Sequence, residues 1–452
     1  MWSQLINVIN RSLSRQAQMN FFVLTTLRKS SPIPLELTFN SHDSDNTGSE
    51  ERCIASSSIH QYLSDIKRTI ETCNSDDWDA MKKITNPYEY IHTIVPGHKY
   101  AVSRMKPLSR SFYKMIEIIK HCKLLPPTSY GQGQSHSGNQ YSRSRASEAP
   151  SSWCSGPIQT FHLAEGPGGF IEALSYLRAN SGDVYNGMTL VDDRSHSCPG
   201  WKKSRSFLDR NPAVRIELGS DGTGNLLSLA NYNACCDKYR QSIDFITADG
   251  GFDFSSDFNN QEILAMNLIA AEVFYAISMQ NVGGTFVLKI FDMFARVTID
   301  LLHLLCMTYD DVIIFKPNTS RIANSEKYVV CKRFNVKSAE ERSDLMGKIR
   351  SFFARVECSQ HQQHVSNLIG ILKPGTHNAH LLSRIEEINA ILGQQQIENI
   401  ISTVSLVQFK TNDRLENYKK LHVQKCVAWC DKYEVPCNKN LISTNTFMSS
   451  VV

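Results

Sequence analysis

The stretch Phe161-His-Leu-Ala-Glu-Gly-Pro-Gly-Gly-Phe170 decides the fold of this chain. Its first residues are typical of a buried strand, the glycines indicate a turn, and a helical pattern follows. In an α/β protein this order brings backbone N–H groups close to a nucleotide-like ligand. The dinucleotide fingerprint needs a further glycine where this sequence has Ile171. The stretch therefore predicts a cofactor turn and disfavours a hydride-transfer enzyme.

Length and composition indicate a soluble globular protein. The chain has 452 residues, of which 41% are hydrophobic and 20% charged, enough to bury a large core in one catalytic domain with extensions. The most apolar segment, 264–279, contains Asn267 and Glu272, so no run has the length of a membrane span and we expect no membrane partner. The 13 cysteines show no CxxC spacing and no clustered histidines, which predicts reduced thiols in an intracellular protein and no metal site.

Composition and periodicity divide the chain into five parts. An N-terminal extension with a linker precedes a helical lead-in, a low-complexity insertion, a catalytic core and a helical C-terminal region: 1–60, 61–125, 126–157, 158–337 and 338–452. The linker is rich in Ser, Asp and Asn, and the insertion is dense in Ser, Gly, Gln and Pro. We expect the insertion to be disordered or loosely packed, because it lacks the apolar residues that join a core.

The first residues carry an apolar helical face and two arginines. No acid precedes Glu36, and the face and its charges are Trp2, Leu5, Ile6, Ile9, Leu13, Arg11 and Arg15. This pattern resembles a mitochondrial transit peptide, and it fits an amphipathic helix docked on the domain equally well. Import into mitochondria is therefore the minority expectation.

From residue 158 onward, strand-like and helix-like segments alternate. The expected strands are 158–165, 188–192, 244–249, 284–290, 310–316 and 327–334, and the expected helices lie near 168–179, 260–280 and 296–307. This alternation predicts a doubly wound, Rossmann-like α/β sheet with helical N- and C-terminal extensions. The loop between the last two strands is too short for a crossover helix, so we expect a terminal antiparallel hairpin.

Polar residues follow several expected strands, at the carboxyl ends where open α/β sheets bind ligands. Glu165 precedes the glycine turn, Asp192 stands where an acid could hold ribose hydroxyls, and Asp249 ends a third strand. Lys289 lies inside an apolar strand, where a lysine is costly unless it is paired. With Asp249 ending another strand, a functional Lys289 is favoured over an edge lysine that reaches solvent.

Basic residues gather between positions 99 and 123. Seven lysines and arginines share this segment with one acid, Glu117: Lys99, Arg104, Lys106, Arg110, Lys114, Lys120 and Lys123. Such an excess suits a polyanion. A solvated helix face explains the same charges equally well.

Five motifs resemble, in chain order, those of the FtsJ/RrmJ-type ribose 2′-O-methyltransferases: Ser109-Arg-Ser-Phe-Tyr-Lys114, Gly166-Pro-Gly-Gly169, Ala248-Asp-Gly-Gly251, Leu288-Lys-Ile-Phe-Asp292 and Ser320-Arg-Ile-Ala-Asn-Ser-Glu326. Further similarity, in Asn86-Pro-Tyr-Glu89, Gly187-Met-Thr-Leu190 and the run 316–331, is to the enzymes of eukaryotes and large DNA viruses that methylate the first nucleotides of capped mRNA. The resemblance covers about residues 78–335. It implies an RNA 2′-O-methyltransferase that acts on capped mRNA.

The resemblance implies a Lys-Asp-Lys-Glu catalytic tetrad made of Lys114, in the lead-in, and Asp249, Lys289 and Glu326. A ribose hydroxyl is a poor nucleophile until its proton is removed or shared. Lys289 is the best candidate base. An apolar strand and the cation of Lys114 should lower its pKa, and the two carboxylates should limit that shift. No metal is required, because the leaving group departs as a neutral thioether.

S-adenosylmethionine is the implied donor. It should lie over the turn formed by Ala164, Glu165, Gly166, Pro167, Gly168, Gly169 and Phe170. We expect Ser109 near its methionine end, Asp192 or Asp193 near its ribose, Asn225 and Leu226 near its adenosine, and Asp249 near its positive charge. For the RNA we expect Lys82 or Lys83 at the cap triphosphate and Asn259, Ser320, Arg321 and Asn324 around the acceptor nucleotide. Each of these RNA side chains could equally cap a helix or order a loop.

Two alternatives stay open. A ribosomal or transfer RNA 2′-O-methyltransferase is favoured by the N-terminal pattern and opposed by the run 320–331. An inactive RNA-binding or capping-complex scaffold is opposed by the intact tetrad. For the main hypothesis we expect capped mRNA as the partner, with contacts to capping or transcription machinery through the C-terminal helices. The expected compartment is the nucleus, or the cytoplasm for a viral enzyme.

Overall fold

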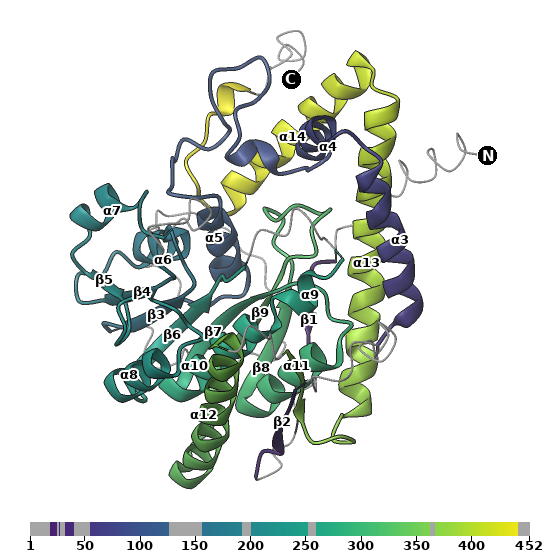
Figure 1. Cartoon of the computed structure of the whole chain (residues 1–452). Helices are drawn as coiled ribbons and strands as arrows, with labels where there is room; N and C mark the ends of the chain where they lie inside the picture. The colour runs from purple at the N-terminus through teal and green to yellow at the C-terminus, as the bar shows by residue number, and fades with distance from the viewer. Residues whose placement is uncertain are drawn as a thin grey trace, which may run out of the picture.

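The computed structural model describes residues 19–24, 27, 32–39, 55–125, 156–191, 200–251, 259–361 and 367–441. These residues form an eight-stranded mixed sheet flanked by helices and a separate two-stranded sheet (Figure 1). The strand order of the large sheet is β1-β8-β9-β7-β6-β3-β4-β5. The predicted doubly wound, Rossmann-like fold is therefore confirmed.

Five strands of the large sheet are parallel: β3 Gln159–Leu163, β4 Val184–Met188, β5 Val214–Glu217, β6 Ile243–Ala248 and β7 Gln280–Ile290. Helices cover both faces, so the central strands are apolar on both sides, as Phe161 and Ile246 show by being fully buried. From β3 the chain runs outward through β4 and β5 and then returns to β6 on the other side of β3. Open α/β sheets bind ligands at such a reversal, in the crevice beyond the carboxyl ends of the two strands that flank it, here β3 and β6.

The other end of the sheet is antiparallel. β8 (Tyr309–Phe315) and β9 (Lys327–Phe334) form the expected hairpin, and β9 lies between β8 and β7, antiparallel to both. The short β1 (Phe21–Val23) adds a further antiparallel edge on β8. Tyr328 lies opposite Lys289 of β7 on one side and opposite Phe315 of β8 on the other. The 316–327 segment, which joins β8 to β9, therefore begins and ends near Lys289.

Helices pack against the two faces of the sheet in two large apolar clusters. One face is covered by α8 (Leu229–Tyr239), α10 (Met266–Met279), α11 (Arg296–Thr308) and α12 (Ala339–His361), and the other by α5 (Ser111–His121), α6 (Gly169–Arg178) and α14 (Asn412–Lys432). The described residues also form the α-helices α3 (Ser57–Glu71), α4 (Ser75–Ile84), α7 (Arg205–Arg210), α9 (Gln261–Leu264) and α13 (Ala379–Gln408). None of the helices among the described residues is long and apolar enough to cross a membrane.

The strand expected at 188–192 is wrong in position, because β4 occupies Val184–Met188. Beyond Met188 the chain packs against the segment of Gly224, whose Cβ, if it had one, would lie 2.1 Å from the Thr189 carbonyl oxygen. Leu190 is already 45% exposed, so the apolar run that suggested a strand lies partly outside the sheet. Asp192, expected at the end of this strand, lies outside the described residues.

The strand β5 was not predicted. It is a four-residue edge strand with no buried residue, so it lacks the apolar run that indicates a strand.

The extensions contain strands as well as the expected helices. β2 (Leu35–Phe39) pairs antiparallel with β10 (Leu368–Leu372), which joins the N-terminal extension to the C-terminal region. α3 and the long α13 run side by side (Figure 1) and share a small apolar cluster with Phe294. The first helical pattern, most of the linker and most of the 126–157 insertion lie outside the described residues.

Candidate active site

The glycine turn after β3 and the end of β6 lie next to each other. Leu163 pairs with Ala248 in register, and the Asp249 N–H donates to the Leu163 carbonyl at 3.2 Å. Glu165 is only 3% exposed, and its Oε1 accepts from the Phe170 N–H at 2.6 Å. Burial, and then the neighbouring Asp249, raise the pKa of Glu165 well above its usual range. Two acidic groups therefore meet at the point where the sheet reverses its order.

The structure brings Lys114, Asp249, Lys289 and Glu326 together. Lys289 Nζ lies 3.2 Å from Asp249 Oδ1 and donates to the Asp249 carbonyl at 2.7 Å. Lys114 Nζ lies 2.6 Å from Glu326 Oε1. The four side chains are between 9% and 16% exposed, so both ion pairs are shielded from water and only weakly screened.

Tyr328 joins the two ion pairs, and sequence reasoning missed it. Its hydroxyl lies 3.2 Å from Asp249 Oδ1 and 3.0 Å from Glu326 Oε1. Burial raises the pKa of Tyr328, so the phenol keeps its proton and can donate to either carboxylate. A signal was present: residues two apart in a strand share one face, and Tyr328 follows Glu326 by two at the start of β9.

The two buried lysines have opposite pKa shifts. Burial lowers the pKa of Lys114, and Glu326 and Asp249 offset only part of that effect. For Lys289 burial also favours the neutral form, but Asp249 and Glu326 outweigh it and raise the pKa above the usual value. The expectation of a lowered pKa for Lys289 is therefore wrong for this structure. A deep position alone does not make a lysine a base when its carboxylate partner is this close.

Glu117 anchors the helix that carries Lys114. It is fully buried, and its carboxylate accepts from the backbone and side chain of Asn318, from those of Thr319, and from Trp429 Nε1, at distances between 2.8 and 3.1 Å. Glu117 lies one turn after Lys114 on α5. The only acid of the basic segment thus fastens α5 to the loop after β8 and to α14.

The 316–327 segment is held to the lead-in by an ion pair with two hydrogen bonds. Arg321 Nε and Nη2 donate to the two carboxylate oxygens of Glu89 at 3.0 and 2.7 Å. Burial opposes ionisation of Glu89, but Arg321 and Arg110 hold its pKa at about 2. Ser320 Oγ lies 3.2 Å from Glu326 Oε1, and the Asn324 side chain is exposed. The structure therefore places Ser320 at Glu326 and commits Arg321 to Glu89.

The glycine turn is shaped for close backbone approach. A Cβ on Gly166 would lie 2.6 Å from the Gly200 carbonyl oxygen, and one on Gly169 would lie 2.3 Å from Ser109 Oγ. Gly168 has φ +102°, a conformation that side chains disfavour. The Glu165 Oε2 atom is buried and has no hydrogen-bond partner among the described residues. An unsatisfied acidic oxygen beside Asp249 fits a ligand that brings a positive charge or a donor to this turn.

For the other predicted site residues, the contacts found are with neighbours outside the cluster of Lys114, Asp249, Lys289 and Glu326. The Asn225 side chain accepts from the Leu227 N–H at 3.0 Å, so its oxygen stabilises a turn, and Leu226 is buried. Lys82 pairs with Asp79 at 2.5 Å in the last turn of α4, and the neighbouring Lys83 is exposed. Asn259 is half-buried at the edge of a described range. Within the described ranges, no group of three or more His, Cys, Asp or Glu residues is arranged to hold a metal ion.

The basic segment does not form one surface. Lys114 is buried at the ion-paired cluster, and the exposed members are Lys99, Arg104, Lys106 and Lys123. Lys120 pairs with Glu434 at 2.5 Å. The charge excess that the sequence shows is thus divided between the crevice and the outside of the molecule.

Comparisons with known proteins agree on one family. The sequence model described as FtsJ-like methyltransferase matches residues 107–334. A Danio rerio protein named cap-specific mRNA (nucleoside-2′-O-)-methyltransferase 2 is 33% identical over 313 residues, which cover 64% of this chain and 36% of the relative. A Mus musculus protein named cap-specific mRNA (nucleoside-2′-O-)-methyltransferase 1 is 36% identical over 179 residues, which cover 38% of this chain and 21% of the relative.

The chain thus spans about a third or less of the length of these two curated relatives. Among solved structures, a ribosomal RNA methyltransferase from Plasmodium falciparum is 19% identical, with a TM-score of 0.31, over 50% of this chain and 97% of that chain.

Proposed function

Because this chain belongs to the FtsJ-like methyltransferase family, we propose that it transfers a methyl group from S-adenosylmethionine to a ribose 2′-hydroxyl of capped mRNA. The observation that carries the proposal is the shielded cluster of two lysines and two carboxylates at the crevice. Capped mRNA as the substrate is supported by the relatives from Danio rerio and Mus musculus, whose names specify that reaction.

The residues that would hold the donor surround the glycine turn. S-adenosylmethionine, when bound, supplies a methyl group on a positively charged sulfur. The turn 164–170 and Ser109 would provide the close backbone contact, Glu165 would offer a hydrogen-bonding oxygen, and Asp249 would face the positive charge. We propose Asn225, Leu226 and Asp192 for the adenosine and ribose. The Asn225 oxygen accepts from the Leu227 N–H, so its amide N–H₂ is the group proposed to bind the donor.

In this proposal Lys289 takes the proton of the acceptor hydroxyl, which it can do only in its neutral form. A protonated lysine cannot act as a base, and Asp249 and Glu326 together raise the pKa of Lys289 and so favour its protonated form. A positively charged donor bound beside Asp249 would offset part of that effect and lower the pKa of Lys289, which would let the lysine release its own proton to solvent. The proton of the 2′-hydroxyl then moves to Lys289 Nζ as the ribose oxygen attacks. The Lys114–Glu326 pair, linked through Tyr328, orients the hydroxyl.

The proposed RNA contacts are of two kinds: contacts to the cap and the acceptor nucleotide, and general electrostatic attraction to the phosphates. Lys82 and Lys83 at the end of α4 are proposed to meet the cap triphosphate, and Ser320, Asn324 and Asn259 to flank the acceptor nucleotide. Arg321 acts through Glu89, since both carboxylate oxygens are bound to its guanidinium. The exposed lysines of the basic segment suit the phosphates of the transcript.

Capped mRNA is made and used inside the cell, so we propose an intracellular site of action, the nucleus for a cellular enzyme. We also propose contacts with capping or transcription machinery through the C-terminal helices. Part of their surface is already used within the chain, because α13 contacts α3 and α4, and α14 contacts α4.

One assay tests the substrate directly. The purified chain is given a radiolabelled methyl donor and equal amounts of capped RNA, the same RNA without its cap, and ribosomal RNA. We expect methyl transfer to capped RNA at a rate at least tenfold above the other two. Equal transfer to capped and uncapped RNA would move the function to ribosomal or transfer RNA, and no transfer to any RNA would favour the scaffold.

A further inference from the structure

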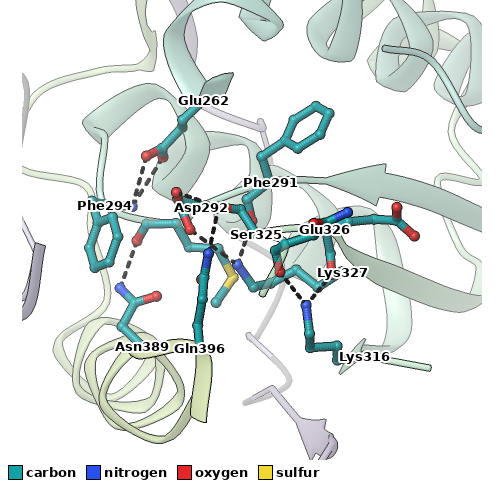
Figure 2. Close-up of polar contacts among 12 residues, drawn as sticks. Glu262, Phe291, Asp292, Phe294, Lys316, Ser325, Glu326, Lys327, Asn389 and Gln396 are labelled. Atoms are coloured by element: carbon teal, nitrogen blue, oxygen red, sulfur yellow. Dashed lines mark hydrogen bonds and ion pairs between the residues drawn. The ribbon is translucent and has the colours of Figure 1, made fainter. Parts of the chain in front are cut away.

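A second buried cluster of charges lies beside the tetrad and is centred on Asp292 (Figure 2). Asp292 Oδ2 accepts from Lys67 Nζ and from Ser325 Oγ, both at 2.9 Å, and Lys327 Nζ lies 3.7 Å from Asp292 Oδ1. These four residues are between 3% and 6% exposed. Burial opposes the charge of Asp292, but Lys67 and Lys327 hold its pKa below the usual range. The carboxylate is therefore ionised, and each of its oxygens faces a lysine ammonium group.

This cluster fastens both neighbours of Glu326. Ser325 is bound to Asp292, and Lys327 Nζ donates to the Phe291 carbonyl at 2.5 Å. Lys316 Nζ donates to the carbonyl of Glu326 itself at 2.8 Å. Asp292 lies three residues after Lys289 on the same chain segment. The backbone around one tetrad carboxylate is thus tied to the segment that carries a tetrad lysine.

Part of the cluster comes from helices outside the 107–334 region that matches the family. Lys67 lies on α3, 225 residues from Asp292 in sequence. From α13, Gln396 Nε2 donates to the Ala323 carbonyl at 2.9 Å, and Asn389 Nδ2 donates to the Met293 carbonyl at 2.8 Å. Figure 2 shows Gln396 and Asn389 reaching from their helix toward this segment. α3 and α13 therefore reach the residues next to the tetrad.

We propose that Lys67 is a positioning residue, which through Asp292 and Ser325 keeps Glu326 in contact with Lys114. The inference rests on the proposed methyltransferase function. Lys67 donates to both Asp292 and Ser325, at 2.9 and 3.2 Å, whereas Lys327 reaches Asp292 only at 3.7 Å. Without Lys67, Asp292 draws Lys327 away from the Phe291 carbonyl, and the backbone of Glu326 moves with it. A displacement of about 1 Å at a reacting group can cost about a hundredfold in rate.

The first test compares Lys67→Met with Arg68→Met, a control on the same helix whose partner Asp65 is exposed. We expect Lys67→Met to lower kcat on capped RNA by about tenfold to a hundredfold. The KM for RNA and the Kd for S-adenosylmethionine, measured by calorimetry, should stay within about threefold of the starting protein. Lys67→Arg should recover part of kcat, and Arg68→Met should change nothing. A kcat within threefold for Lys67→Met, or an equal loss of donor affinity, would overturn the proposal.

The second test asks whether Lys67 acts through Glu326. In a double-mutant cycle, Lys67→Met should add less than about threefold to the loss caused by Glu326→Gln, because the group that it positions is already gone. Multiplying losses would overturn the inference. If Lys67→Met does not fold, Ser325→Ala removes only a hydroxyl and should lower kcat in the same direction. An inactive starting protein would instead contradict the proposed function, so the two failures are distinguishable.

Discussion

Lys114 and Lys289 show how neighbouring carboxylates decide the charge of a buried lysine. Burial is the largest influence on the pKa of both side chains, but Asp249 and Glu326 together outweigh it only at Lys289. The sequence placed Lys289 in an apolar strand with the Lys114 cation nearby, which predicts a lowered pKa for Lys289. It could not give the closeness of the carboxylates, such as the 3.2 Å separation between Lys289 and Asp249, and Asp249 and Glu326 together reverse the direction of the shift.

Replacing Lys289 by alanine should abolish methyl transfer and leave donor binding nearly intact. The lysine is proposed to act on the ribose hydroxyl, and a general base contributes roughly a hundredfold to ten-thousandfold in rate. The measurement is single-turnover transfer together with calorimetric titration of S-adenosylmethionine. Lys348→Ala removes a partly exposed lysine on α12 that pairs with Asp344, and this control should match the starting protein. Activity within a few-fold after Lys289→Ala would remove this residue from its role.

Glu272 should make the protein less stable as pH rises. It is fully buried on α10, its Oε1 accepts from the Gly250 N–H at 3.1 Å, and burial raises its pKa to about 8. The unfolded carboxyl titrates near pH 4.5, so the unfolded state binds fewer protons than the folded state between about pH 4.5 and 8. Stability therefore falls across that window, by an amount on the order of a few kcal/mol.

Glu272→Gln has the shape of the neutral acid and does not titrate. Its melting temperature relative to the starting protein should increase from pH 5 to pH 8. A difference that stays constant over this range would show that Glu272 does not titrate in the window. Glu357→Gln on α12, whose carboxylate shows no such burial, is a suitable control.

At the scale of elements, the predictable parts were those with a strong local pattern. β3 with its glycine turn, β6, β7 and the β8–β9 hairpin stand out because buried parallel strands are apolar runs bounded by turn residues. The predicted position of β4 was wrong because the apolar pattern continues past Met188. The strand ends there, where the backbone of Gly224 lies close to the Thr189 carbonyl. β5 carries its side chains at an edge and lacks any such run. Tertiary contacts, not local patterns, set these boundaries.

The glycine turn can be tested as an element. Gly168→Val should destroy donor binding, because φ of +102° disfavours a branched side chain and its Cβ would lie 3.3 Å from Trp201. Gly97→Val is a matched control, since Gly97 has φ of +82° with nothing within 4 Å of its added Cβ. It imposes comparable backbone strain away from the turn and should leave donor affinity unchanged. Unchanged affinity for Gly168→Val would remove this turn from the donor site.

At the scale of the whole molecule, the fold joins segments that no local pattern connects. The tetrad takes Lys114 from α5 and Lys289 from β7, with Asp249 directly after β6 and Glu326 directly before β9. The resemblance to a family allowed these residues to be named from the sequence. Contacts such as Lys67 with Asp292 could not be predicted, because they connect an extension to the core across 225 residues. Periodicity within a helix reports which face is buried and says nothing about the partner.

The basic residues outside the crevice should control how the whole molecule meets RNA. Affinity for short capped RNA should fall steeply with salt, by an amount set by the number of phosphates neutralised. Reversing Lys82 and Lys83 together to Glu should weaken capped RNA more than uncapped RNA, because only capped RNA places a triphosphate bridge beside the acceptor ribose. Binding is measured by fluorescence anisotropy at several salt concentrations. Equal weakening of both RNAs would mean that these lysines provide only general attraction.

The position of the transferred methyl group tests the central claim most directly. Capped RNA is incubated with the protein and S-adenosylmethionine, digested to nucleosides and cap dinucleotides, and analysed by mass spectrometry. The account predicts one added methyl on the ribose 2′-oxygen of a cap-proximal nucleotide, and none with Lys289→Ala. A methyl group on a base, at an internal nucleotide, or undiminished in the Lys289→Ala protein would contradict it.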